Sequence, residues 1–198
     1  MHQLEQLIQS IEMDKRHTYP PVESWQPSHV GEIDIYIDSQ GKWWHEGTPF
    51  EREALVNLFA SILRFENDAY YLVTPVEKLK ITVADVAFMA DSLICTDVDE
   101  KVYQLVTQCN DIIALDENAD WELRDYQDTQ IPYVRVRHDL WARIDRHVFY
   151  QMADIAIKQA EVIRRQGKVE SVKGEVNSSG ELNFISSASN FCLGSFSE

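Results

Sequence analysis

The sequence of 198 residues lacks the features that mark membrane, secreted and zinc-binding proteins. It has three cysteines, Cys95, Cys109 and Cys192, and no CxxC pair, so neither a zinc knuckle nor a disulfide framework is indicated. No run of about 18 apolar residues is present that could span a membrane. The N-terminus also lacks a basic start followed by an apolar run, which argues against a signal peptide. We therefore expect a soluble, cytoplasmic protein in a reducing compartment.

Basic residues are scarce as well. The chain has 18 Lys and Arg residues against 33 Asp and Glu residues, a formal net charge of -15. A surface this acidic repels phosphate backbones and anionic headgroups, so we expect neither a nucleic acid nor a membrane as a partner. The net charge does not exclude a small anionic ligand that is held by a few local arginines.

Enzyme signatures are missing too. The sequence has no GxSxG motif, no P-loop and no Rossmann glycine pattern. Its six histidines show neither HxxxH nor HExxH spacing, so we expect no metal site and no cofactor. An enzyme would need a general base near arginines, and Glu77 is the one candidate for that role.

The chain contains 44% hydrophobic and 11% aromatic residues, which is enough for a packed core. Its length suits one large domain or two small ones. An amphipathic helix is predicted over 3–13, and alternation predicts strands over 31–37 and 42–46. Thr48-Pro49-Phe50-Glu51 has the pattern of a capping box, which predicts the start of a helix. That helix would bury Leu55, Leu58, Phe59 and Ile62.

A hairpin over 64–73 leads into Pro75, where we place the boundary between an N-terminal domain (1–75) and a C-terminal domain (76–198). Strand patterns in the second domain cover 77–83, 88–95, 101–107, 110–115, 121–126 and 131–137. Asp139 is then expected to cap a long helix that ends at Gly167 and carries inward Leu140, Ile144, Val148, Met152 and Ile155. Phe184 to Phe196 is apolar enough to dock as one or two strands. Both domains thus place strands before one helix, which indicates an α+β fold with a duplicated plan.

Tyr133, Arg135 and Arg137 lie two residues apart on a predicted strand, so their side chains are expected to share one face. Two arginines on one face can bind a phosphate or carboxylate in bidentate fashion, with the tyrosine ring available for stacking. A salt-bridged strand edge is the alternative, because so many Asp and Glu residues are present.

Several residues of the first domain are further candidates. Arg52 lies in the first turn of its predicted helix, where an anion could be held, although it could also pair with Glu51. Of Trp43 and Trp44, one must leave the core face and contact the other domain or a ligand. Glu77 and Lys78 follow Pro75 at the domain boundary, where either a ligand site or an ion pair would explain them.

Six segments together resemble one bacterial family, named domain of unknown function 1285. They are 31–34, 41–47 (Gly-Lys-Trp-Trp-His-Glu-Gly), 49–52, 58–64, 72–78 (Leu-Val-Thr-Pro-Val-Glu-Lys) and 132–137 (Pro-Tyr-Val-Arg-Val-Arg). The resemblance extends from Trp25 to Met152, and its most specific part is the Thr-Pro-Val-Glu-Lys run.

The resemblance implies a two-domain α+β fold with duplicated strand-strand-helix motifs, in which the C-terminal domain is similar to a pleckstrin-homology-like barrel capped by a helix. It implies no established biochemical activity. It suggests a ligand site at the domain interface, for a nucleotide-like molecule, and a role in signal transduction. Carried over to this sequence, it predicts as ligand-binding residues Trp44, Arg52, Arg64, Thr74, Glu77, Lys78, Tyr133, Arg135 and Arg137.

Three hypotheses follow for function. The first is a cytoplasmic module that binds a small anionic, nucleotide-like ligand and acts in signalling. The second is a protein–protein interaction module whose C-terminal domain binds a partner peptide. An enzyme is the least favoured. The observation that separates the first two is whether the arginines line a closed pocket or an open surface.

Overall fold

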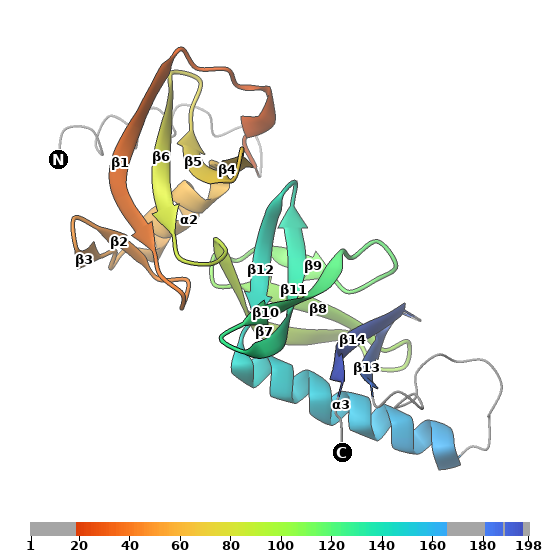
Figure 1. Cartoon of the computed structure of the whole chain (residues 1–198). Coiled ribbons are helices and arrows are strands. Elements are labelled where there is room, and N and C mark those ends of the chain that lie inside the picture. Colours follow the sequence, from red (N-terminus) through yellow and green to blue (C-terminus); the bar gives the residue numbers. More distant parts are fainter. Residues whose placement is uncertain (1–18, 166–180, 188, 196–198) are drawn as a thin grey trace. The chain divides into compact units, whose positions relative to one another are not determined.

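The protein, described by a computed structural model over residues 19–165, 181–187 and 189–195, divides into two compact units, Met1–Ala87 and Phe88–Glu198 (Figure 1). Both units are rich in β-sheet and contain few helices, so the predicted α+β class is mostly β. No helix in the described ranges is long and apolar enough to cross a membrane. The helix predicted over 3–13 and the predicted helix end at Gly167 lie outside the described residues.

The first unit has one sheet of six strands with one α-helix. In chain order its elements are η1 (Val22–Ser24), β1 (His29–Ile37), β2 (Trp43–His45), β3 (Thr48–Pro49), α2 (Glu53–Ser61), β4 (Leu63–Glu66), β5 (Ala69–Val73) and β6 (Glu77–Val83). The second unit contains β7 (Phe88–Asp97), β8 (Val102–Thr107), β9 (Ile112–Ala114), β10 (Trp121–Tyr126), β11 (Thr129–Arg137), β12 (Leu140–Ile144), α3 (Arg146–Arg165), β13 (Glu181–Ser186) and β14 (Ser189–Ser195).

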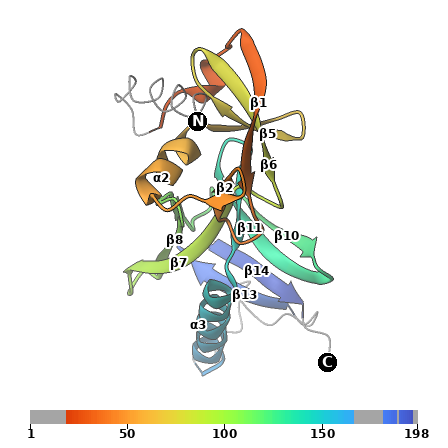
Figure 2. The same cartoon turned by 90° about the vertical axis from the view of Figure 1, so that its left-hand side faces the viewer.

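The sheet of the first unit has the strand order β3-β2-β1-β6-β5-β4. Its alternating isoleucines point into the core as predicted, with Ile35 and Ile37 at most 1% exposed. The ring of Phe59 in α2 stacks on Trp43 at a centroid distance of 6.3 Å, which places the helix against this face (Figure 2). Because β6 pairs with both β1 and β5, it belongs to the first sheet. The chain therefore divides after Ala87 and not at Pro75.

The predicted capping box does not start the helix. Thr48–Pro49 is the short strand β3, which pairs with β2, and α2 begins at Glu53 with no side-chain cap on Arg52. Glu46 and Gly47 have φ values of 47° and 74°, as a two-residue hairpin turn requires. The hairpin therefore takes Thr48 into the sheet, where it cannot cap a helix.

The sheet of the second unit has the strand order β10-β11-β12-β7-β8-β9. Val134, Ala142 and Leu105 are fully buried in its core. The hairpin β13–β14 confirms the predicted docking of the C-terminal segment, since Trp121 donates its indole N–H to the Cys192 carbonyl at 2.8 Å. On the other side, the Gln159 amide of α3 forms two hydrogen bonds with the backbone of Ile185.

The predicted helix start at Asp139 is also wrong. Leu140, Ala142 and Ile144 alternate inward on the strand β12, which pairs with β11 and runs parallel to β7. The helix α3 begins at Arg146, and Asp145 caps it: its side chain accepts the His147 N–H at 2.9 Å and its carbonyl accepts the Phe149 N–H.

The duplication lies in the strand order and not in the predicted strand-strand-helix plan, because α2 lies between the third and fourth strands of its unit and α3 follows the sixth. In each unit the first and last of the six strands pair in parallel, and all the remaining pairs are antiparallel. The third and fourth strands form the edges of the sheet. The six-stranded order is the same in both sheets. Neither sheet closes, because β3 and β4, like β9 and β10, do not pair with each other. A pleckstrin-homology-like barrel is therefore not confirmed.

Replacing Asp145 with Ala removes the oxygen that caps α3, and we expect the free energy of unfolding to fall by about 1 kcal/mol. Asp139→Ala is the matched control, because this exposed residue lies in the β11–β12 turn. It should change that free energy by less than about 0.5 kcal/mol. Urea denaturation of both variants measures the difference, and a larger effect of Asp139→Ala would contradict the observed helix start.

Candidate functional site

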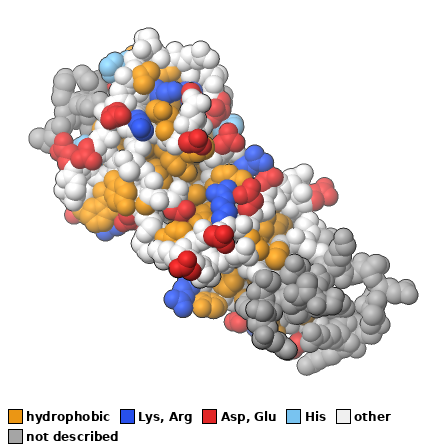
Figure 3. Space-filling view, viewed as in Figure 1, with side chains coloured by type: hydrophobic (Ala, Val, Ile, Leu, Met, Phe, Trp, Pro, Cys, Tyr) orange, Lys and Arg blue, Asp and Glu red, His pale blue; other side chains and the backbone are white. Residues whose placement is uncertain are grey.

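The nine predicted ligand-binding residues fall into two sets. The first unit holds Trp44, Arg52, Arg64, Thr74, Glu77 and Lys78, and the second holds Tyr133, Arg135 and Arg137. On the face of the molecule shown in Figure 3, Lys and Arg side chains are scattered among Asp and Glu side chains and form no broad basic patch. Each arginine therefore has to be judged by its own contacts.

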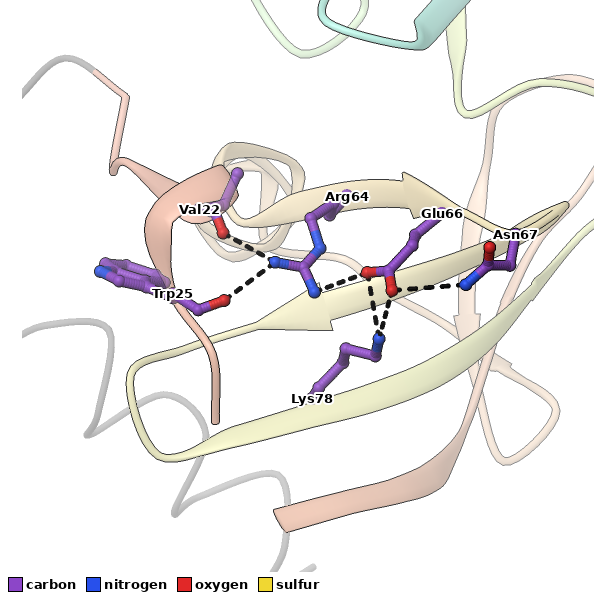
Figure 4. A network of polar contacts seen from close by, with 6 residues as sticks. All are labelled: Val22, Trp25, Arg64, Glu66, Asn67 and Lys78. Atoms are coloured by element: carbon purple, nitrogen blue, oxygen red, sulfur yellow. Dashed lines mark hydrogen bonds and ion pairs between the residues drawn. The ribbon is translucent and has the colours of Figure 1, made fainter. Parts of the chain in front are cut away.

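Arg64 holds the segment that precedes the sheet of the first unit. One terminal nitrogen of its guanidinium donates to the carbonyls of Val22 and Trp25, both at 3.0 Å, and the other forms an ion pair with Glu66 at 2.6 Å (Figure 4). The residue is 9% exposed. The donors of its terminal nitrogens attach η1 and the following Trp25 to β4, so Arg64 has a structural role.

Lys78 completes the same network. Its ammonium group donates to both carboxylate oxygens of Glu66, at 3.0 and 3.1 Å, and lies 4.4 Å from the centre of the Tyr71 ring. The hydrogen bond from Lys78 lowers the pKa of Glu66 most; burial opposes this effect, and the charge of Arg64 adds to it. Lys78 and Glu66 thus stabilise the pairing of β4, β5 and β6.

Thr74 and Trp44 also have local explanations, and the half-buried Glu77 takes part in the turn before β6 through its backbone N–H. The Thr74 hydroxyl oxygen accepts the N–H groups of Val76 and Glu77, so this fully buried residue shapes the turn before β6. Trp44 donates its indole N–H to Asp38 at 2.8 Å. Arg52 is exposed beside α2, and this helix terminus carries no further indication of a ligand.

In the second unit, a bulge separates the two predicted arginines. β11 pairs with β12 through Arg135 and Trp141 and next through Arg137 and Leu140, so one extra residue lies in β11 between these pairs. Such a bulge reverses the alternation of side chains, and directly paired residues share a face. Arg137 therefore lies on the face of the buried Leu140, and Arg135 lies on the opposite face with Tyr133. The prediction that all three share one face is wrong.

Both arginines already have carboxylate partners. Arg135 donates from Nε to Asp120 at 2.6 Å and also contacts it through Nη2, and these two side chains are 39% and 48% exposed. Arg137 pairs with Asp111, which is nearly buried and also accepts the Thr107 hydroxyl at 3.1 Å. The salt-bridged alternative from the sequence thus applies to both.

The Tyr133 ring is covered as well. It is 1% exposed, and the Arg124 guanidinium lies 4.8 Å from its centre and 4.3 Å from the centre of the Trp141 ring. Arginine and aromatic side chains therefore stack on one another across β10, β11 and β12. With its face occupied by Arg124, the tyrosine is not available to stack on a ligand base.

Arg135 and Arg137 nevertheless border an open depression of about 390 Å³. It is lined by Ile112, Ile113, Ala114, Asp116, Asn118, Ala119, Asp120, Arg135, Val136, Arg137 and His138. No residue of β8 lines it, so the depression lies along the outer edge of β9. The opposite wall is the end of β11 beyond its pairing with β10, where the Arg135 N–H donates to the Asp120 carbonyl at 3.0 Å.

Sequence reasoning identified the arginines of this depression and missed the rest. The sequence places Ile112 in the predicted strand 110–115, and Asp116 and Asp120 between that strand and the next, 121–126, and assigns none of them a role in binding. The acidic run beside the arginines was the available signal for their ion pairs. The position of β9 at an open edge could not be predicted, because local sequence patterns do not determine the order of strands in a sheet.

Glu66→Gln removes the charge from the Arg64–Glu66–Lys78 network while keeping the side-chain size. Because the pKa of Glu66 is lowered from 4.5, its charge stabilises the fold above pH 4.5, and this contribution is lost as the pH falls through the folded-state value. We expect the free energy of unfolding of wild type to exceed that of the variant at neutral pH, and this difference to shrink below pH 4.5. Urea denaturation at several pH values measures the gap. Glu51→Gln, at an exposed position outside the network, should show no such trend; a similar trend would refute the assignment.

Two family models match the chain: the N-terminal domain of the domain of unknown function DUF1285 over residues 20–86, and its C-terminal domain over residues 87–176. The boundary between the two matches coincides with the division of the structure after Ala87. No curated protein matches the chain.

Two crystal structures are similar. The DUF1285 family protein from Silicibacter pomeroyi DSS-3 is 34% identical with a TM-score of 0.74, and the match covers 96% of this chain and 94% of that one. The DUF1285 family protein from Shewanella baltica OS155 is 25% identical with a TM-score of 0.49, over 61% of this chain and 90% of that one. The family matches over both units and the extent of the first similarity agree, and the chain therefore belongs to the DUF1285 family.

Proposed function

We propose that the second unit is a recognition module that binds an extended segment of a partner protein in the depression beside β9. The observation that supports this most is the open form of the depression, whose walls are a strand edge and the end of β11. A peptide can use backbone groups along such a wall, as in the strand-addition mode of recognition.

The pairing of the arginines favours a peptide over a small anion. Asp111 and Asp120 neutralise Arg137 and Arg135, and Asp116 also lines the depression. An anionic ligand would have to displace a carboxylate from each arginine. It would also approach a protein whose net charge is -15.

A second candidate function is binding of a small anionic, nucleotide-like ligand in the same depression. Arg135 supports it, because Nε and Nη2 present the forked donor pair that suits a carboxylate or phosphate. Its ion pair with Asp120 is about half exposed, and such pairs contribute only about 0–1 kcal/mol, so exchange for a ligand anion would cost little. Either form of binding would suit a role in signal transduction.

Selection of random peptides on the full chain, followed by NMR titration, tests the first candidate. Selected peptides should shift the amide signals of residues 112–120 and 135–138. Asn118→Trp should abolish binding, because Asn118 lines the depression and an indole there would fill part of it. Gln130→Trp is the matched control at an exposed position of β11 away from the depression and should leave binding unchanged.

ATP and citrate are titrated in parallel, on wild type and on Arg135→Ala. Shifts at residues 135–138 that Arg135→Ala removes, without any peptide binding there, would replace the first candidate with the second. Selected peptides that bind elsewhere on the chain, together with silent ATP and citrate titrations, would refute both.

A further inference from the structure

We infer that β9 receives the partner segment as an added strand, and that this segment is cationic. The inference rests on the proposed peptide recognition and specifies both its geometry and its chemistry. Three features of the second unit support it: the outward backbone groups of β9, the uncharged sequence of this edge strand, and the charges of the connection that follows.

The backbone of β9 alternates between its partner strand and the outer edge. The Asp111 carbonyl accepts the Thr107 N–H at 2.9 Å, and the Leu115 N–H donates to the Tyr103 carbonyl at 3.1 Å. Odd-numbered residues therefore direct their polar groups at β8. In an antiparallel ladder the intervening residues, Ile112 and Ala114, direct theirs the opposite way.

No strand among the described residues pairs with that outer side of β9, which is the last strand in the order of its sheet. The N–H and C=O groups of Ile112 and Ala114 thus form a short template with two donors and two acceptors. An extended peptide laid along β9 would satisfy all four and would place alternate side chains over the depression.

The sequence of β9 lacks two of the devices that usually prevent strand addition, charged residues and prolines. Proteins protect edges with charged residues, prolines, bulges or a covering segment. β9 has the sequence Ile-Ile-Ala, without a charge or a proline, and Ile112 is 66% exposed. Ile113 and Leu115 are buried on the opposite face, which anchors the strand in position. The strand is short, and the end of β11 and the Arg137–Asp111 ion pair lie close to it, so an added strand could form only a few hydrogen bonds.

The two units differ at the corresponding connection. In the first unit the chain that leaves the edge strand β3 forms α2 before it enters β4. In the second unit the chain that leaves β9 reaches β10 through residues 115–120, with no helix. Because this connection is short, the side of β9 that faces the depression stays uncovered.

The charges of this connection select the partner. Asp116, Glu117 and Asp120 lie within it, and Asp120 is used by Arg135. Among the described residues no cationic side chain forms an ion pair with Asp116 or Glu117, and Glu117 is exposed. Asp116 lines the depression, where a lysine or arginine side chain of a strand on β9 would meet its carboxylate, and Glu117 is its neighbour in the chain. The net charge of -15 would increase the rate at which a cationic segment approaches.

Two blocked peptides, acetyl-Lys-Val-Lys-Val-Lys-Val-Lys-amide and its Glu-for-Lys counterpart, test the inference on the full-length chain by NMR titration. The lysine peptide should bind and shift the amide signals of Ile112 and Ala114. Its affinity should fall as the ionic strength rises, since the contacts are between exposed charges. The glutamate peptide should not bind. Equal binding of both peptides, or preference for glutamate, would overturn the cationic assignment.

Ala114→Pro tests the added strand, because it removes an outward N–H without removing a bond to β8. It should lower the affinity for the lysine peptide by about tenfold, which is the loss expected for one hydrogen bond in a short ladder. Ala114→Thr keeps the N–H and is the matched control, which should bind like wild type. Asp116→Asn with Glu117→Gln should weaken the lysine peptide and reduce its salt dependence.

A lysine peptide with N-methylated valines provides a test that needs no protein variant. In one strand register the valine N–H groups donate to β9, and in the other register the lysine N–H groups do. Two series of peptides are therefore measured, one N-methylated at the valines and one N-methylated at the lysines. Loss of binding in one series supports strand addition. If peptides shift residues 112–120 and 135–138 while both N-methylated series and Ala114→Pro bind normally, strand addition is wrong and peptide recognition stands. If no peptide binds in the depression, both strand addition and peptide recognition at this site are refuted.

Discussion

The parallel pairing of the first and last strands is the constraint on which each unit depends. β1 pairs with β6, and β12 pairs with β7, so the two ends of each six-strand segment meet in the middle of its sheet. The strands in the middle of the segment must then become the edges. β9 is an edge for this reason, although its residues are as apolar as those of an internal strand. The open depression beside β9 is therefore a consequence of connectivity, and the short connection that follows leaves it uncovered.

Ion pairing decides which of the arginines remain available for binding. Arg64 joins η1 to the first sheet and Arg137 is held by the nearly buried Asp111, whereas the partner of Arg135 is exposed enough to exchange easily. In a chain with 33 acidic residues against 18 basic ones, carboxylate partners are abundant, and Arg64, Lys78, Arg124, Arg135 and Arg137 each pair with one. Arg64, Arg135 and Arg137, which suggested an anion site, thus hold strands and loops together, and in our proposal the acidic groups near the depression are the recognition features.

Local signals predicted most strands correctly and both helix starts incorrectly. Alternation identified 31–37, because a half-buried strand needs period two whatever its neighbours. Thr48 and Asp139 looked like caps, yet both lie in or next to hairpins whose strands pair with the sheet. A cap contributes about 1 kcal/mol, and the burial of Leu140, Ala142 and Ile144 outweighs it. Alternation over 140–144 was visible in the sequence and was the better signal.

The sequence by itself determined the α+β class, the family, the strand-rich character and the positions of the arginines, because these follow from composition, periodicity and short motifs. Tertiary structure decided the division after Ala87, the opposite orientations of Arg135 and Arg137, and the exposure of the outer edge of β9. Each of these depends on which strand pairs with which and in what register. Such pairings join residues far apart in the chain, and a single extra residue in β11 is enough to reverse a side chain from one face of the sheet to the other.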